Sequence, residues 1–180
     1  GNIISSRAWK NGATDIVVAS SGSPVSNTDG KHPCIWRGKV DPWGDAYSAI
    51  CDILIERTGA NTTEDPYVYT PYFLSDPKKY ANGVITADYI KLNYTLPGVD
   101  GYAKTLGYDA RYKFVRLTDA LGASSTTYLA AYYYYPRSAV CVVFVGGYWS
   151  SGRYCSPVYF VCNNSPSESN IARLARLFVT

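Results

Sequence analysis

Residues able to carry out acid–base or nucleophilic chemistry are few in this sequence of 180 residues, and they lie far apart. The single histidine, His32, stands before Pro33 in a turn-like stretch, and no serine or cysteine motif accompanies it. Such a histidine is more typical of a hydrogen-bonded structural residue than of a catalytic base. The common nucleophile, phosphate-binding and zinc-protease motifs are absent from the sequence. The sequence therefore indicates a protein that is not an enzyme and needs no cofactor.

The cysteines give no clear metal or disulfide pattern. Five occur, an odd number without C-x-x-C spacing: Cys34, Cys51, Cys141, Cys155 and Cys162. This pattern suits neither a zinc site nor a disulfide framework. It favours free, buried thiols in a chain that folds in a reducing cytoplasm, with a Cys155–Cys162 bridge left open. Asp-rich calcium loops are missing too, so we expect no metal site.

Composition and charge narrow the class of protein. Hydrophobic residues make up 47% and charged residues 17%, which favours a compact fold over disorder. No apolar run is long enough to span a bilayer, so no membrane insertion is expected. The net charge of +3 is spread thinly, and its longest basic cluster is Lys78–Lys79, which argues against nucleic-acid binding. The N-terminus lacks a signal-peptide pattern, and the missing initiator Met suggests a processed or excised domain.

The hydrophobic pattern predicts a mixed α+β fold with strands concentrated toward the C-terminus. A leading strand near 16–19 precedes loops, and Asp41 and Pro42 fit the start of a helix over 41–50. That helix would bury Trp43, Ala46, Tyr47 and Ile50 at i, i+3, i+4 and i+7. Long loops with scattered strands are predicted from residue 58 to residue 119. The predicted strands cover 53–55, 114–117, 128–135, 139–145, 158–161 and 174–179.

The segments 128–135 and 139–145 are predicted to form an antiparallel pair around Pro136–Ser138. Within the first of them, four consecutive tyrosines occupy 132–135. Alternation along a strand would send two of these rings inward and two outward. The inward pair would pack in the core, and the outward pair is open to ligand contact.

A series of motifs near the C-terminus is more specific. It comprises Gly146-Gly147-x-Trp149-x-x-Gly152, the aromatic stretch Val158–Phe160, Asn163-Asn164-x-x-Ser167 and Ala175–Leu177. In this order, the motifs resemble the variable region of the C-type-lectin-fold proteins that diversity-generating retroelements diversify, as found in phage tails and on some bacterial surfaces. Further stretches upstream look similar to that family, so the resemblance covers roughly residues 30 to 180: Pro33–Gly38, Asp41–Asp45, Leu96–Tyr102 and Leu106–Asp109.

The resemblance implies a C-type lectin fold, with small antiparallel sheets, one or two helices and long loops. It implies an N-terminal lead-in of strand and loops over 1–30, and a lectin domain over 31–180 with a variable region at about 133–177. The formylglycine-generating enzymes share that fold, so an oxidoreductase of their kind is the alternative. They need a reactive cysteine pair or a metal cluster. A calcium-dependent lectin is disfavoured, because the usual Glu-Pro-Asn and Trp-Asn-Asp triplets are absent.

The C-terminal motifs suggest a fixed frame that carries variable side chains. Glycines can adopt turn geometries closed to other residues, a tryptophan can anchor the loop, and paired asparagines can tie loop backbone together. The expected frame residues are Gly146, Gly147, Trp149, Gly152, Asn163 and Asn164. The expected ligand-binding residues, aromatic, charged and hydroxyl side chains typical of antibody-like surfaces, are Tyr148, Ser150, Ser151, Arg153, Tyr154, Ser156, Tyr159, Glu168, Ile171 and Arg173.

These expectations lead to a functional hypothesis: a receptor-binding or adhesin module with a hypervariable face. Its expected partner is a protein or glycan of the host surface. The module would sit at a phage tail tip or on a bacterial cell surface, after folding in the cytoplasm. It would belong to a larger tail or surface protein, in which it could form an oligomer.

Overall fold

The computed structural model describes residues 17–18, 24–25, 35–36, 39–40, 47–124, 126, 131–147, 159–167 and 173–174. The chain divides into two compact units. One unit comprises Ile50–Val143 and Phe160–Glu168, and the other comprises Gly1–Ala49, Phe144–Tyr159 and Ser169–Thr180. Each unit is described by itself.

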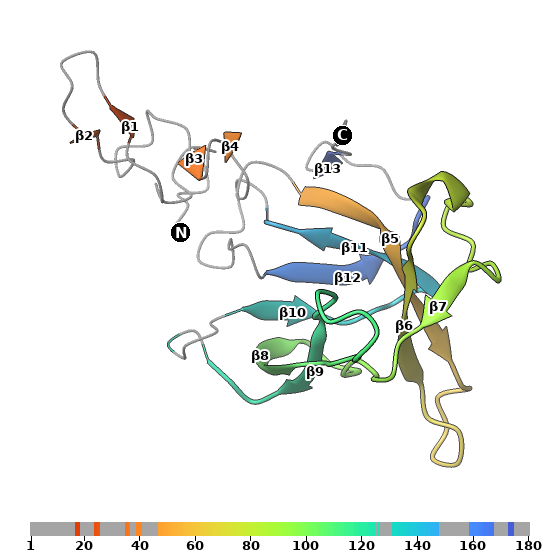
Figure 1. Ribbon diagram of the computed structural model, residues 1–180. Coiled ribbons are helices and arrows are strands. Elements are labelled where there is room, and N and C mark those ends of the chain that lie inside the picture. The colour runs from red at the N-terminus through yellow and green to blue at the C-terminus, as the bar shows by residue number, and fades with distance from the viewer. Residues whose placement is uncertain are drawn as a thin grey trace. The chain divides into compact units, whose positions relative to one another are not determined.

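Most of the described strands belong to one sheet with the strand order β7-β6-β5-β11-β12-β10-β8-β9 (Figure 1). The strands of this order are β5 (Tyr47–Thr58), β6 (Val68–Leu74), β7 (Tyr89–Lys91), β8 (Gly101–Leu106), β9 (Thr118–Leu121), β10 (Tyr132–Tyr134), β11 (Val140–Val145) and β12 (Phe160–Asn164). Strands β5 and β6 pair antiparallel from Ile53↔Phe73 to Thr58↔Val68. The longest strand, β5, is therefore hydrogen-bonded on both sides, to β6 and to β11.

The predicted helix over 41–50 is wrong where the structure describes it. Tyr47–Ile50 form the first part of the 12-residue strand β5, and 41–46 lie outside the described residues. Further along the same strand, Ile53, Leu54 and Ile55 are all at most 7% exposed, so both faces of β5 are covered. Burial on both faces suits β-branched and aromatic side chains, which favour strands when neighbouring strands are available.

The fold-class prediction is also wrong. The described residues contain no α-helix, and their only helical element is the short 3-10 turn η2 (Pro77–Lys79). Asp76 caps the start of this turn, because its side chain accepts a hydrogen bond from the backbone N–H of Lys78. An α+β C-type lectin fold with one or two helices does not fit this arrangement, which is built almost entirely of strands. Within the described ranges, no helix is long and apolar enough to cross a bilayer.

Strands β10 and β11 are present, but they do not form the predicted hairpin. β12 lies between them, and it pairs parallel with β10 at Tyr133↔Phe160 and Tyr134↔Val161. On its other side β10 pairs antiparallel with β8. The chain leaves β10 where Asp100 accepts a hydrogen bond from the backbone N–H of Tyr135 and pairs with Arg137 at 2.9 Å. These two contacts direct the chain away from a tight turn.

The predicted alternation of the tyrosines holds over Tyr132–Tyr134 in β10, but Tyr135, the second ring expected to point inward, is only partly buried. Tyr133 is fully buried, its ring lies 5.4 Å from that of Phe160, and its hydroxyl donates to the carbonyl of Pro97 at 2.8 Å. Tyr132 and Tyr134 are partly exposed, and their rings lie 4.9 Å apart. The sheet thus packs one aromatic face into a core whose largest members include Leu54, Leu74 and Val143.

The other unit contributes short strand pairs. β1 (Val17–Val18) pairs antiparallel with β2 (Pro24–Val25), as does β3 (Ile35–Trp36) with β4 (Lys39–Val40). β13 (Arg173–Leu174) pairs parallel with the first residues of β5, Tyr47 and Ser48. The leading strand predicted near 16–19 is therefore confirmed at Val17–Val18.

Candidate ligand-binding surfaces

The described residues on the two sides of the predicted variable segment are joined by a hydrogen bond. β11 ends at Val145, and the chain returns to the described residues at Tyr159, directly before β12. The backbone N–H of Gly146 donates to the carbonyl oxygen of Tyr159 at 3.2 Å. Gly146 and Gly147 have φ values of 89° and 75°, a region that favours glycine because a Cβ is strained there. This geometry fits the frame role predicted for the two glycines.

Tyr159 takes a different position from the one expected for a ligand contact. Its side chain is 1% exposed, its hydroxyl lies 3.2 Å from that of Tyr47, and the two rings stack at 6.2 Å. The Tyr47 ring also meets Phe144 edge-on at 6.1 Å. This burial favours a packing role for Tyr159, at the base of the segment, over the predicted ligand contact.

The other predicted residues are only partly placed. Oδ1 of Asn163 is buried and accepts no hydrogen bond within the described part of the chain, and Asn164 is 8% exposed. The backbone of Arg173 lies in β13, opposite Tyr47. The remaining predicted residues lie outside the described residues: Tyr148, Trp149, Ser150, Ser151, Gly152, Arg153, Tyr154, Ser156, Glu168 and Ile171. Their roles stay predictions.

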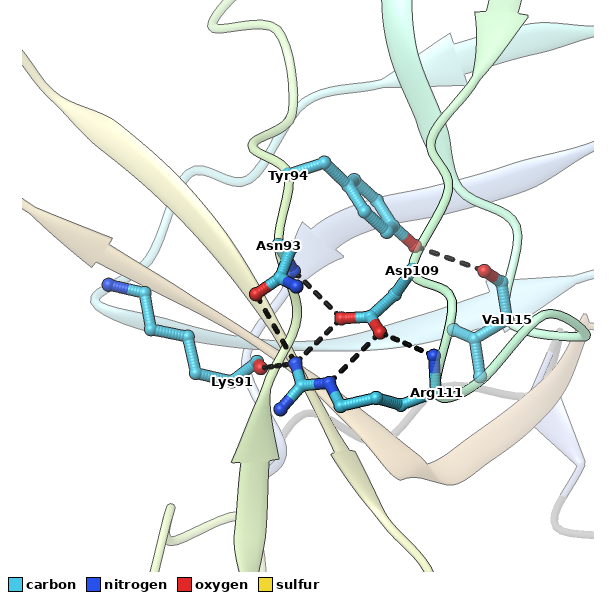
Figure 2. Close-up of polar contacts among 6 residues, drawn as sticks. All are labelled: Lys91, Asn93, Tyr94, Asp109, Arg111 and Val115. Carbon is cyan, nitrogen blue, oxygen red and sulfur yellow. Dashed lines mark hydrogen bonds and ion pairs between the residues drawn. The ribbon is translucent and has the colours of Figure 1, made fainter.

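A second surface, which the sequence did not reveal, lies on the loop between β8 and β9, residues 107–117 (the β8–β9 loop). Its anchor is Asp109, whose carboxylate is 1% exposed (Figure 2). Oδ1 accepts from the backbone N–H and from Nε of Arg111, at 2.9 and 3.0 Å. Oδ2 accepts from Nη2 of Arg111 at 2.7 Å and from the backbone N–H of Asn93 at 3.0 Å. All lone-pair directions of the carboxylate are thereby used.

The same guanidinium ties the loop to the end of β7. Nη2 of Arg111 donates to the carbonyl of Lys91 at 2.7 Å and to Oδ1 of Asn93 at 3.3 Å. Hydrogen bonds from the Arg111 side chain hold the pKa of Asp109 well below its usual range, with the backbone N–H groups of Arg111 and Asn93 adding to the effect. The pair therefore stays charged and bonded at neutral pH.

A second fastening point is Tyr94. Its hydroxyl donates to the carbonyl of Val115 at 3.3 Å (Figure 2). The same oxygen accepts from the backbone N–H of Leu117 at 3.4 Å. Burial raises the pKa of Tyr94 to about 12, so the hydroxyl keeps its proton and can serve both bonds. Val115 and Leu117 are at most 5% exposed, and Gly107 donates to the carbonyl of Leu117 at 2.8 Å to close the loop.

Between these fastenings, the loop presents aromatic and basic side chains to solvent. Phe114 is 73% exposed, although its ring touches those of Phe73 at 5.4 Å and Tyr112 at 6.3 Å. The guanidinium of Arg116 lies over the half-exposed ring of Tyr108, 4.5 Å from its centroid. Exposed aromatic rings beside arginine are the side chains that most often dominate binding energy at protein interfaces.

The sequence carried a weak signal for this loop. Aromatic and basic residues alternate through Tyr108, Arg111, Tyr112, Lys113, Phe114 and Arg116. The prediction instead assigned 114–117 to a strand, and that assignment is wrong: these residues lie in the loop, and the strand β9 begins at Thr118.

The described thiols do not form a reactive site. Cys141 and Cys162 are buried and Cys51 is exposed, and all three are free. The bridge left open between Cys155 and Cys162 is therefore not formed. Burial raises the pKa of the Cys141 and Cys162 thiols, and partial burial together with the charge of Asp52 raises the pKa of Cys51; a raised pKa opposes formation of the nucleophilic thiolate. In the described part of the chain, no three histidine, cysteine or acidic side chains come together as metal ligands. Cys34 and Cys155, like His32, lie outside that part.

Comparisons with protein-family models, curated proteins and solved structures gave no match for this chain.

Proposed function

We propose that this chain is a ligand-binding module that presents variable side chains from the segment 148–158, together with residues near 168–173, to a protein or glycan on a host surface. It would act as a receptor-binding or adhesin part of a phage tail or a bacterial surface protein. The observation that carries the proposal is the hydrogen bond from Gly146 to Tyr159, which closes the base of the segment between the sheet neighbours β11 and β12.

The closed base of the segment matters because it fixes the two ends of the segment, so that the fold does not depend on the residues between them. The buried strand residues and the stacked Tyr47–Tyr159 pair fix where the segment starts and stops. Side chains between fixed ends can change at little cost to folding, which is why binding residues concentrate on loops carried by a rigid scaffold. The proposal therefore does not depend on the lectin fold that the sequence suggested.

The chemistry of the segment supports binding over catalysis. Between the fixed ends it offers two tyrosines, an arginine and several serines: Tyr148, Tyr154, Arg153, Ser150, Ser151 and Ser156. Tyrosine supplies large contact area at low entropic cost, and serine supplies adaptable hydrogen bonds. The oxidoreductase alternative gains no support from the described thiols, since burial raises the pKa of each.

The test is a comparison of binding profiles on a printed array of glycans and surface proteins. The wild-type chain is compared with a triple variant, Tyr148→Ala, Arg153→Ala and Tyr154→Ala. Each interface anchor is worth more than about 1 kcal/mol, so loss of three anchors should weaken binding by at least about 100-fold. The melting temperature should change by less than about 3 °C, because these side chains are proposed to face the ligand and not the core.

The matched control changes another connection between neighbouring strands, the exposed turn joining β5 and β6. Its variant is Thr63→Ala, Glu64→Ala and Asp65→Ala, at three exposed positions of that turn, and it should bind like the wild type. The proposal fails if the wild type binds nothing on the array, or if the first triple variant binds as the wild type does. It also fails if that variant loses stability by several kcal/mol, because its side chains would then belong to the core.

A further inference from the structure

The β8–β9 loop has features of a binding surface that the segment 148–158 does not share. Its exposed ring, Phe114, is held in place from below, because it meets both Phe73 and Tyr112 edge-on. Phe73 is itself 6% exposed and belongs to β6, so the support under Phe114 is part of the core. A large apolar ring that is both rigid and 73% exposed loses little conformational entropy when a partner covers it.

The charge around this ring is basic. The loop carries Arg111, Lys113 and Arg116, and its one carboxylate, Asp109, is buried under four hydrogen bonds. The next acid along the chain, Asp119, accepts from the hydroxyl of Thr105 at 2.5 Å. An incoming negative charge therefore meets cations without a competing exposed carboxylate on the loop.

Arg116 is the cation of this loop whose orientation best suits it to bind a partner. Its Nε donates to the carbonyl of Lys113 at 2.8 Å and its Nη1 to that of Gly107 at 3.2 Å, while Tyr108 supports the guanidinium from one side. Within the described residues no carboxylate pairs with Arg116. Its orientation is thus fixed by neutral groups, and its full charge is available to a ligand carboxylate, the group for which guanidinium geometry is suited.

We propose that the β8–β9 loop is a second, preformed docking surface that binds an acidic polypeptide segment carrying an apolar or aromatic side chain. The apolar side chain would cover Phe114, and neighbouring carboxylates would meet Arg116 and Lys113. Since Arg111 is paired with Asp109, the loop offers Lys113 and Arg116 as its cations for a partner. Two cations form too small a basic surface to track a nucleic-acid backbone, whose binding needs a longer basic stripe. An acidic peptide matches both the ring and the charge.

The test uses the complete chain and a phage-displayed library of random 12-residue peptides. Selection on the wild type is compared with selection on Phe114→Ala and on Arg116→Ala. We expect the wild type to enrich peptides rich in Asp and Glu with one large apolar residue, and both variants to lose that enrichment. One enriched peptide is then synthesised and titrated by fluorescence anisotropy. Phe114→Ala should weaken its binding by about tenfold or more, and Arg116→Ala by about fivefold.

Two controls distinguish specific binding at this surface from nonspecific hydrophobic binding. Val99→Ala removes another exposed apolar side chain, 62% exposed, and should leave the peptide affinity unchanged. Phe114→Tyr keeps the ring and should restore most of it. Near-UV circular dichroism and the melting temperature show that each variant is folded. The peptide affinity should also fall as salt rises, because charge pairs contribute to it.

Several results would overturn the proposal. One is the absence of any enriched peptide, and another is enrichment without an acidic bias or without dependence on Phe114. Concentration-dependent self-association that Phe114→Ala abolishes, seen by sedimentation velocity, would mean that a second copy of the chain covers the loop. Binding of an oligothymidylate through the cations, without acidic peptides, would make the ligand a nucleic acid.

Discussion

Replacing Gly107 with alanine tests whether the Tyr94 ring holds the β8–β9 loop in place. Gly107 is buried, and a Cβ built there overlaps three ring carbons of Tyr94 (Cγ, Cδ2 and Cε2). The ring is not free to swing away, because its hydroxyl is bonded to the backbone of both Val115 and Leu117. One added methyl group therefore forces either strain or the loss of these two bonds.

The expected cost follows from these two outcomes. Forcing extra volume into a packed site typically costs about 1–3 kcal/mol. Moving the ring instead relieves that strain and gives up two hydrogen bonds worth about 0.5–1.5 kcal/mol each. The strain and the loss of the two hydrogen bonds are alternatives, so their costs do not add. We therefore expect Gly107→Ala to lower the free energy of unfolding by about 2–3 kcal/mol. For a chain of this length, that lowers the melting temperature by about 5–10 °C.

Urea titration followed by fluorescence measures this cost, and a second background identifies its cause. In a Tyr94→Leu background the overlapping ring carbons are gone, so Gly107→Ala should cost less than about 1 kcal/mol. Gly98→Ala is the matched control, because a Cβ there only touches the edge of the Tyr69 ring, at 3.0 Å. Equal costs of Gly107→Ala in the two backgrounds would refute the claim that Tyr94 fastens the loop.

Three further predictions follow from the same structure. Tyr133→Phe removes the 2.8 Å donor to the partly buried carbonyl of Pro97 from a fully buried side chain, so it should cost about 1–2 kcal/mol in urea unfolding with little change in binding. The lowered pKa of Asp109 means that its stabilising bonds are fully present above about pH 4, its unfolded pKa, and are lost as pH falls through the folded value. The urea midpoint should therefore drop more steeply below pH 4 in the wild type than in Asp109→Asn, and equal slopes would contradict this. Gly146→Ala forces a Cβ onto a residue with φ of 89° and should cost about 1–3 kcal/mol by thermal unfolding, whereas an unchanged melting temperature would show that the turn relaxes freely.

Some strand positions in the second half of the chain could be predicted from the sequence because their apolar runs are continuous and bounded by turn residues. The prediction at 139–145 matches β11 closely, that at 158–161 overlaps β12 only at residues 160 and 161, and the alternation at Tyr132–Tyr134 holds. The pairing of these strands could not be predicted. β10 has β12 beside it instead of β11, a choice made by contacts such as Asp100 with Tyr135 that join residues far apart in sequence.

The error at 47–50, the part of 41–50 that the structure describes, has a physical cause. Tyr47 and Ile50 are three positions apart, a separation that suits one face of a helix but that also occurs between opposite faces of a strand. Both residues belong to β5, which lies between β6 and β11 in the sheet. A window of ten residues holds no information about those partners, so its periodicity was a poor guide.

The two candidate surfaces differ in what a sequence can reveal about them. The signals for the segment 148–158 lie close to it in the sequence. They are the glycines with positive φ and the two strands that the segment joins. The β8–β9 loop depends on Asp109 reaching Asn93 and on Tyr94 reaching Val115 and Leu117, contacts that cross 16 to 23 positions. Alternating Val115 and Leu117 are buried just as a strand would bury them, yet their backbone groups bond to the Tyr94 hydroxyl and to the backbone of Tyr112 and Gly107, and not to a neighbouring strand. Phe114 is therefore presented by a loop and not by a strand. The surface can be recognised only when these contacts between residues far apart in sequence are known.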